Sequence, residues 1–544
     1  MPRGRLRGSV CEERFEVAEN RISPRLRSIS GGELGLNPNS CAGSGVPEPP
    51  NQDKSEKQFS PGDGKAGRST RIGVKKASTT QAMIQRTSDH ENPNHAANKR
   101  VFPLSLAPID WFFYRDDCSQ YPMVFYVDLD FSGRLDHERM AIALTEAIYR
   151  HPLMYAIVQP GRRNRPSWVL APERLPKIDW GPMGTPLDTG GSDSIDITQV
   201  PGLRVWARES ETSTKVTMQF HHATCDGTGA YRFIGDLLGC YIRQLPSCAD
   251  KVEMGTFDAK QLRLRPSKMR SLTAGASFMQ AMKCGVQQGW KTFGARITAL
   301  RAPKARPDGA SFPGIITHEF SGDDQKKLRN VATELGVTMN DLLIWKLFQA
   351  IGVWNGSMGE GRKLRMLVPS DMRAGDDFEQ PACNMTAYTF LTHNAGELAN
   401  AEQLLASIRQ DTLQIKHGNL QQQFIDGLTS AMSNPNFLTF LLRRNFCLAT
   451  CVLSNAGDPA KRFTCRLPKT RGKVSCDDFT LEAITGVPPL RRNTRSTLSV
   501  SSYGRKLIFS MRCDPHRFSQ ADTTALLDVF CDQLRPLLAD QDET

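Results

Sequence analysis

The sequence predicts an α/β (α+β) protein in which strands and helices mix in two successive parts of the chain, behind a long N-terminal tail. Three observations carry this prediction: a polar first hundred residues, apolar residues at both strand and helix spacing beyond residue 100, and a Pro-rich basic stretch near residue 300. The 544 residues exceed what one ordinary core holds and suffice for two domains.

Residues 1–98 are rich in Gly, Pro, Ser, Asn and charged residues and show no sustained apolar period. Such a stretch cannot bury enough surface to offset its ordering entropy, so we expect a disordered basic tail. Residues 1–100 hold 17 Lys and Arg against 11 Asp and Glu, which is half of the net charge of +12. The remainder is mildly basic and has no basic patch with interleaved aromatic residues, so nucleic acid is not the expected partner.

Residues 99–285 are expected to form the first folded part. Alternating apolar residues predict strands at 123–131 and 214–220, and helical spacing predicts helices at 137–150 and 230–244. Residues 286–312 are a Pro-rich linker candidate. Residues 313–544 again mix both patterns and form the second folded part.

The fourteen cysteines include no CxxC pair, so zinc spacing is absent and free thiols in a reducing cytoplasm are expected. No apolar segment reaches the length of a membrane span, and no signal peptide is recognised at the N-terminus. We therefore expect a cytoplasmic protein with no membrane span.

The stretch His221-His222-Ala-Thr-Cys-Asp226-Gly227 lies where the second predicted strand passes into a helix. A histidine at a strand end is a good general base, because its ordinary pKa leaves it mostly neutral at working pH. Neighbouring residues on a strand point opposite ways, so only one histidine can face a given cleft. His222 shares the side of Phe220 if the strand continues regularly.

Other interpretations of the same residues remain open on the residues alone. A histidine at a strand end is often simply packed and hydrogen-bonded. Zinc binding through His222 and Asp226 would need further ligands that are not nearby in sequence. Cys225 with His222 would form a thiol nucleophile and its base.

The string His221-His222-x-x-x-Asp226-Gly227 resembles the HHxxxDG signature of the condensation-domain and chloramphenicol-acetyltransferase-like acyltransferase superfamily. Weaker matches follow in family order over residues 100–540. They are Arg150-His151-Pro152-Leu153 ("RHxxLR"), Gly336 to Asp341 ("GvTxND"), Val368 to Arg373 ("vPvdlR"), Asn384-Met385 ("Nm") and Ser454-Asn455-Ala-Gly457 ("SNxG"). The resemblance is to standalone alcohol-acetyltransferase-like or polyketide-associated members.

The resemblance implies two similar halves, each a mixed β-sheet flanked by helices, with an active-site tunnel between them. It implies that His222 is the general base for acyl transfer from a thioester to an alcohol or amine, without an acyl-enzyme. Asp226 would be a structural anchor paired with Arg150. Supporting roles fall to His221 and to Gly227, whose backbone would approach the substrate.

Asn384, Ser454 and Asn455 are further candidates for lining the tunnel and contacting substrate. No metal and no cofactor are expected; the co-substrate would be acyl-CoA or an acyl-carrier thioester. The expected partners are thus acyl-CoA, a small-molecule acceptor and, as an alternative donor, a separate carrier protein.

The chain departs from the family pattern in two places. Tyr155 stands where "RHxxLR" has its second arginine, and no DFGWG string is present, which argues against the plant-type branch. No carrier or adenylation segment is recognised, which favours a free acyl-CoA donor. Two alternatives stay open: a non-catalytic condensation-like protein that binds a carrier protein or acyl ligand, and a wax-ester or diacylglycerol type of acyltransferase at a membrane surface. The apolar-then-basic stretch at residues 437–444 motivates the latter.

Overall fold

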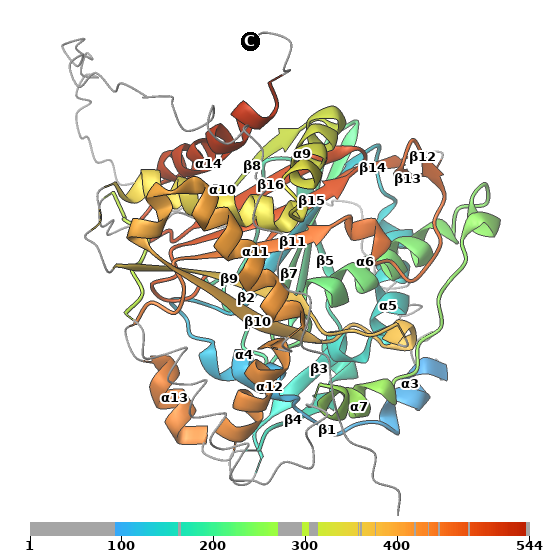
Figure 1. Ribbon diagram of the computed structural model, residues 1–544. Helices are drawn as coiled ribbons and strands as arrows, with labels where there is room; N and C mark the ends of the chain where they lie inside the picture. The colour runs from blue at the N-terminus through green and yellow to red at the C-terminus, as the bar shows by residue number, and fades with distance from the viewer. Residues whose placement is uncertain are drawn as a thin grey trace, which may run out of the picture. The chain divides into compact units, whose positions relative to one another are not determined.

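The computed structural model describes residues 93–539 except 162–164, 270–295, 304–313, 357, 359–361, 376, 418–419, 433–434, 444–445 and 477–478. The described residues fall in one compact unit (Figure 1). Most of the predicted tail, residues 1–92, lies outside them. Its last six residues form part of helix α3 (Pro93–Lys99), whose Asn98 is buried, so the folded part begins earlier than predicted.

A seven-stranded sheet carries the first half of the fold, in the order β12-β13-β14-β2-β7-β6-β5. The strands are β2 (Val124–Ser132), β5 (Ile178–Pro182), β6 (Leu203–Glu209), β7 (Ser213–His221), β12 (Lys469–Thr470), β13 (Lys473–Cys476) and β14 (Phe479–Val487). Helices α5 (His137–Arg150) and α6 (Gly227–Ile242) pack on it. The apolar faces of β2 and β7, together with those of α5 and α6, form one buried cluster.

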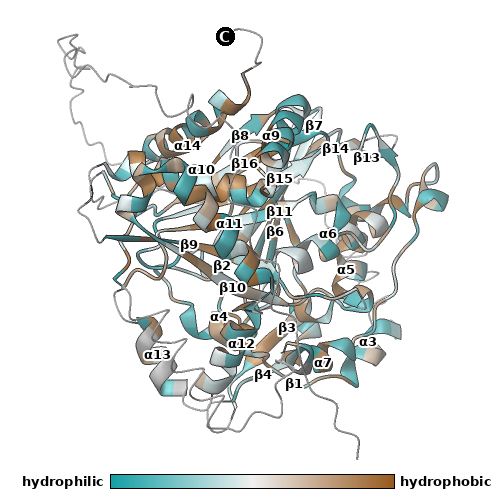
Figure 2. Ribbon diagram, in the orientation of Figure 1, coloured by the Kyte–Doolittle hydropathy of each residue, from teal (hydrophilic) through white to brown (hydrophobic). Residues whose placement is uncertain are grey.

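A six-stranded sheet carries the second half, in the order β10-β9-β11-β15-β16-β8. The strands are β8 (Ile315–Phe320), β9 (Lys363–Asp371), β10 (Thr386–Asn394), β11 (Cys451–Gly457), β15 (Ser496–Tyr503) and β16 (Lys506–Cys513). Its helices are α9 (Gly322–Glu334), α10 (Met339–Asn355), α11 (Ala401–His417) and α14 (Gln520–Leu534). Figure 2 shows more apolar residues on α10 than on α9, in keeping with the deeper burial of α10.

Smaller elements complete the described chain. A three-stranded sheet has the order β1-β4-β3. These elements are β1 (Leu104–Ser105), β3 (Ala156–Gln159), β4 (Ser167–Leu170), α4 (Pro108–Asp116), α7 (Gln261–Lys268), α12 (Leu420–Ala431), α13 (Pro435–Arg443) and the 3-10 turns at Pro152–Tyr155, Pro172–Arg174, Ala249–Lys251, Asp377–Glu379, Ala395–Ala399, Pro459–Lys461 and Arg535–Leu537. Both sheets are mixed and flanked by helices, so the predicted fold class is confirmed.

The chain crosses between the sheets in a way that the predicted boundary at residue 313 does not capture. Strands β12, β13 and β14 come from the second part of the sequence, yet they extend the first sheet. β14 runs antiparallel to β2, with Val487 opposite Tyr126. Of the predicted linker, residues 296–303 are described, and there Ile297 bridges to Lys363 of β9.

A disulfide joins Cys248, after α6, to Cys476 of β13. The expectation that all cysteines are free thiols is therefore wrong for this pair, which lies 228 residues apart in sequence. Sequence spacing could not reveal the pair, because only the crossover of β13 onto the first sheet brings the two sulfurs together. None of the helices in the described ranges is long and apolar enough to cross a membrane.

Candidate active site

The motif occupies the turn between β7 and α6. β7 ends at His221, and α6 begins at Gly227 with Asp226 as its N-cap residue. The Asp226 carboxylate accepts a hydrogen bond from the Gly229 N–H at 2.8 Å, which satisfies one of the free donors of the first helical turn. The strand–turn–helix context predicted for the motif is confirmed.

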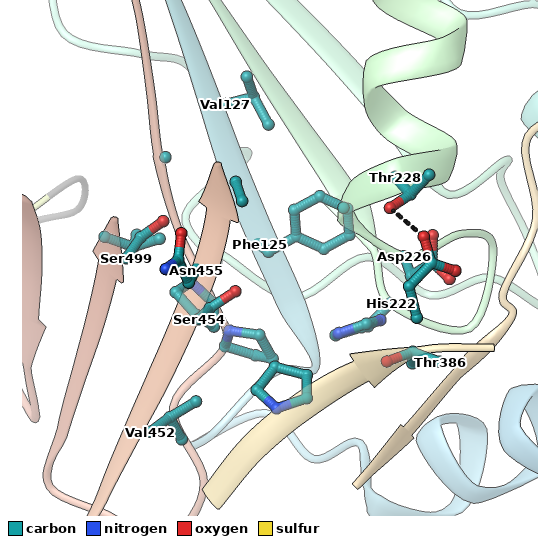
Figure 3. Close-up of a pocket in the computed structure, with 18 of the residues that line it drawn as sticks. Phe125, Val127, His222, Asp226, Thr228, Thr386, Val452, Ser454, Asn455 and Ser499 are labelled. Carbon is teal, nitrogen blue, oxygen red and sulfur yellow. Dashed lines mark hydrogen bonds between the residues drawn. The ribbon is translucent and has the colours of Figure 1, made fainter. Parts of the chain in front are cut away.

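His222 lies in this turn with its ring against aromatic side chains. The ring stacks on Phe113, with centroids 3.9 Å apart and planes 13° apart, and lies 5.1 Å from the ring of Phe125. Its backbone N–H donates to the carbonyl of Met123, the residue before β2. Figure 3 shows the imidazole projecting from the turn into a cavity.

The environment of His222 favours the neutral imidazole. Burial lowers the pKa of His222 to about 4, and the opposing influences of its own backbone carbonyl, Asp226 and Asn384 are weaker. Nδ1 is buried and has no hydrogen-bond partner of ordinary geometry among the described residues. A neutral ring with one edge toward the cavity is the form that can accept a proton.

His221 points to the other side of the chain and is fully buried. Its Nδ1 accepts a hydrogen bond from the Ala223 N–H at 3.1 Å, and its Nε2 lies 3.6 Å from the Asp117 carboxylate. His221 therefore shapes the turn and does not line the cavity.

Asp226 is paired with Arg373, not with Arg150 as the resemblance implied. The two guanidinium nitrogens of Arg373 each lie 3.0 Å from an oxygen of Asp226, and the Met385 N–H donates to the same carboxylate at 2.7 Å. Burial alone would raise the pKa of Asp226, but the charge and hydrogen bonds of Arg373 and the backbone N–H groups hold it below its usual value. Asp226 is thus an ionised anchor between the halves.

Arg150 instead pairs with Asp236 of α6 and donates to the carbonyl of Gly255. The buried His151 lies 3.5 Å from the same Asp236 carboxylate and accepts the Ala382 N–H at 2.9 Å. Arg150 and Asp236 lie on the two helices that pack together, α5 and α6, whereas Arg373 follows a strand of the other half. Sequence order alone could not distinguish these partners, and Arg150 does not line the cavity.

Asn384 lies behind the turn and not in the cavity. Its Nδ2 donates to the carbonyls of His222 at 2.7 Å and Ala223 at 2.9 Å, and lies 3.2 Å from Asp110. Asp110 in turn pairs with Arg265, and all three side chains are fully buried. Asn384 therefore holds the backbone of the turn that carries His222, which differs from the substrate-contacting role predicted for it.

The cavity is built from both halves. Its lining includes Phe125 and Val127 of β2, the turn with His222, and Ser454 and Asn455 of β11. The cavity has a volume of about 150 Å³. Figure 3 shows Ser454 on the wall opposite His222. The predicted positions of Ser454, Asn455 and Gly227 at the cavity agree with the structure.

Gly227 and Thr228, the first two residues of α6, also line the cavity. A Cβ atom on Gly227 would meet no protein atom within 4 Å, so packing does not require glycine here. The Thr228 hydroxyl donates to Asp371 at 3.0 Å, and Asp371 also lies 3.0 Å from Arg373. The two carboxylates that line the cavity, Asp226 and Asp371, are therefore both bound to Arg373.

Sequence reasoning gave no role to three buried charged residues, Arg373, Asp110 and Arg265. Arg373 is the last residue of the "vPvdlR" match, and this match is the sequence feature that could have marked it as a site residue. Nothing in the local pattern marks Asp110 or Arg265. Over the described ranges, no group of three or more His, Cys, Asp or Glu side chains could hold a metal ion.

Comparison with solved structures places this geometry among known folds. The chain superposes on the trichothecene 15-O-acetyltransferase TRI3 of Fusarium sporotrichioides (TM-score 0.59, 13% identity, 80% of this chain and 94% of the other). It also superposes on polyketide synthase associated protein 5 of Mycobacterium tuberculosis (0.55, 13%, 81% and 98%). The chain has the chloramphenicol-acetyltransferase-like fold. Its structural neighbours are the acyltransferases and condensation-type domains that the motif predicted.

The same fold occurs in the X-domain of teicoplanin biosynthesis, solved in complex with OxyB (TM-score 0.55, 13% identity, 81% of this chain and 94% of that one). In sequence, the chain matches an uncharacterised protein of Mycobacterium tuberculosis H37Rv, Rv2305, at 22% identity over 373 residues, covering 65% of this chain and 83% of the relative. No protein-family model matches the chain.

Proposed function

We propose that the protein is an acyltransferase that moves an acyl group from a thioester to an alcohol or amine acceptor, with His222 as the general base. The observation that carries this proposal is a neutral, half-buried His222 on the wall of a cavity built by both halves of the fold. Fold likeness to acyltransferases supports acyl transfer as the class of reaction.

In the proposed reaction, the neutral imidazole of His222 accepts the proton of the acceptor hydroxyl. The freed oxygen attacks the thioester carbonyl and gives a tetrahedral oxyanion. Collapse of this intermediate breaks the carbon–sulfur bond, and the leaving thiolate takes the proton back from His222. No covalent acyl-enzyme forms. Ser454 lies on the wall facing His222, where its hydroxyl is available to donate a hydrogen bond to the oxyanion.

The charges around the cavity favour an alcohol over an amine. Asp226 and Asp371 are both paired with Arg373, so neither is free to receive an ammonium group. The lowered pKa of His222 also indicates that this site disfavours a positive charge. A neutral hydroxyl enters such a site without the desolvation cost of an ammonium ion, so the product we propose is an ester.

Acyl-CoA is the donor we propose, with a carrier-protein thioester as the alternative. Neither donor needs a resident cofactor. A donor series of acyl-CoAs of increasing chain length, each with mixed alcohols, identifies the donor through thiol release.

A non-catalytic role is the second candidate, because one structural neighbour is an X-domain solved in complex with OxyB. A membrane-surface acyltransferase is the third, and one residue of α13 supports it: Phe440 is 58% exposed. Failure to release thiol from any donor would favour the non-catalytic role. Flotation of the protein with lipid vesicles would favour the membrane-surface role.

The decisive experiment replaces His222 by Ala and follows thiol release. We expect transfer to fall by at least about a hundredfold, the contribution of general base catalysis, while the circular dichroism spectrum is unchanged. His137→Ala, on the surface against Trp180, is the matched control and should retain full activity. Normal activity of H222A would overturn the mechanism.

A further inference from the structure

A second cavity lies in the first half and shares no lining residue with the catalytic cavity. We call it the α3 pocket. Its walls are α3, the turn at Arg100 and Val101, the end of α5, and residues 257–263 leading into α7. Figure 1 shows α3 and α7 near each other at one end of this half. The pocket has a volume of about 360 Å³.

Positive side chains dominate this pocket. Four cations line it, Arg100, Arg150, Lys260 and Arg263, against one carboxylate, Asp258. The catalytic cavity, by contrast, has one lining cation, Arg462, which lies 3.7 Å from Asp371. The α3 pocket therefore carries an excess of positive charge that the catalytic site lacks.

Three of these positive charges have no carboxylate partner within the described part of the chain. Arg263 donates to the backbone carbonyls of Arg100 at 2.9 Å and Val101 at 2.7 Å, which orient its guanidinium but do not neutralise it. Arg100 and Lys260 are exposed and form no ion pair with a described residue. Only Arg150 is neutralised, by Asp236.

Two of the three guanidinium groups, those of Arg150 and Arg263, are held before any ligand arrives. Arg150 is fixed by Asp236 and the Gly255 carbonyl and lies over the ring of Phe257, 5.2 Å from its centroid. Arg263 is fixed by its two carbonyl acceptors. Ordering long cationic side chains costs free energy when an anion binds, and for Arg263 the fold has already met this cost. The planar guanidinium matches phosphate oxygens in geometry.

We propose that the α3 pocket binds a small phosphate-bearing ligand, through Arg100, Lys260 and Arg263. Two or more uncompensated cations suit a phosphate monoester, which carries up to two negative charges near neutral pH, better than a single carboxylate. Phe257 and Tyr149 supply an apolar wall for the carbon part of the ligand. This site does not depend on the proposed acyl transfer.

The test measures binding of phenyl phosphate and inorganic phosphate to the full chain by calorimetry at low ionic strength. The variant combines Arg100→Gln and Lys260→Gln, because neither side chain has an ion-pair role in the fold. The matched control combines Lys326→Gln and Arg409→Gln, two exposed cations elsewhere. We expect the pocket variant to bind phenyl phosphate at least about tenfold more weakly and the control to bind as the original chain does.

Hydrogen exchange locates the ligand independently. Phenyl phosphate should slow exchange at residues 93–101 and 257–263, whereas phenol should not. Competition by inorganic phosphate distinguishes recognition of the phosphate group alone from recognition of the whole monoester. The proposal is overturned if the full chain binds neither phosphate nor phenyl phosphate, or if the control variant loses as much affinity as the pocket variant.

Discussion

The guanidinium of Arg373 donates two hydrogen bonds of 3.0 Å to the carboxylate of Asp226, and both side chains are almost completely buried. Asp226 is the N-cap residue of α6 in the first half, and Arg373 follows β9 of the second half. The pair therefore joins the two halves directly behind the turn that carries His222. The same arginine also binds Asp371 at the cavity mouth.

Replacing Arg373 by Ala leaves the buried Asp226 carboxylate without its counter-charge. We expect the free energy of unfolding to fall by about 3–5 kcal/mol, measured by urea denaturation. Arg466→Ala is the control, because its pair with Glu253 has side chains 87% and 72% exposed and should contribute less than about 1 kcal/mol. Equal stability losses in the two variants would contradict the anchoring role of Arg373.

Gly227 and Gly229 offer a matched pair of substitutions two residues apart. A Cβ on Gly229 would lie 2.7 Å from the carbonyl oxygen of Cys383, so Gly229→Ala should cost about 1–3 kcal/mol of stability. A Cβ on Gly227 meets no protein atom within 4 Å, so Gly227→Ala should fold normally. Because Gly227 lines the cavity, we expect its variant to raise KM for the acceptor. An unchanged KM would show that substrate does not approach this backbone.

The pH dependence of transfer should report the ionisation of His222. The base is active only when neutral, and burial lowers the pKa of His222 to about 4. We therefore expect kcat/KM to stay level from about pH 8 down to about pH 5 and to fall about tenfold per pH unit below pH 4. Circular dichroism at each pH separates this loss from unfolding. A midpoint near the ordinary histidine value, about 6.5, would mean that the ring is solvated in the working enzyme.

The Cys248–Cys476 disulfide should stabilise the crossover of β13 onto the first sheet. Because the bonded residues are 228 apart in sequence, loop-closure entropy alone corresponds to about 5 kcal/mol as an upper estimate. The double variant Cys248→Ser with Cys476→Ser should unfold at a lower urea concentration than the original chain. Cys118→Ser, which removes an exposed free thiol, is the control. Identical midpoints for the double variant and the original chain would contradict a stabilising disulfide.

Local patterns sufficed for much of this protein. Alternation along 214–220 and the apolar spacing after residue 230 placed a strand before His221 and a helix after Gly227, and both are present. Strand and helix patterns depend on neighbouring residues, so they can be read from the chain itself. Strand alternation separated the two histidines onto opposite sides, and the family resemblance assigned His222, not His221, to the cavity.

Pairings between distant residues were not readable in this way. The sequence contains many arginines, and nothing local distinguishes Arg373 from Arg150 as the partner of Asp226. Asn384 stood out as a polar residue in a matched motif, but its contact with the His222 carbonyl depends on how the 382–385 segment passes behind the turn. The pairing of β14 with β2 in the first sheet could not be read from the sequence either, because the register between two strands depends on how both strands pack.

The sequence by itself therefore determined the mixed fold class, the strand, turn and helix around His222, and the class of chemistry that a histidine at that turn can perform. Tertiary structure alone decided the partners: Arg373 for Asp226, Asp236 for Arg150, Cys476 for Cys248, and the cations gathered around the α3 pocket. The physical reason is the range of the interactions. Backbone propensity acts within a few residues, whereas ion pairs, disulfides and pockets depend on segments that meet only after the core has packed.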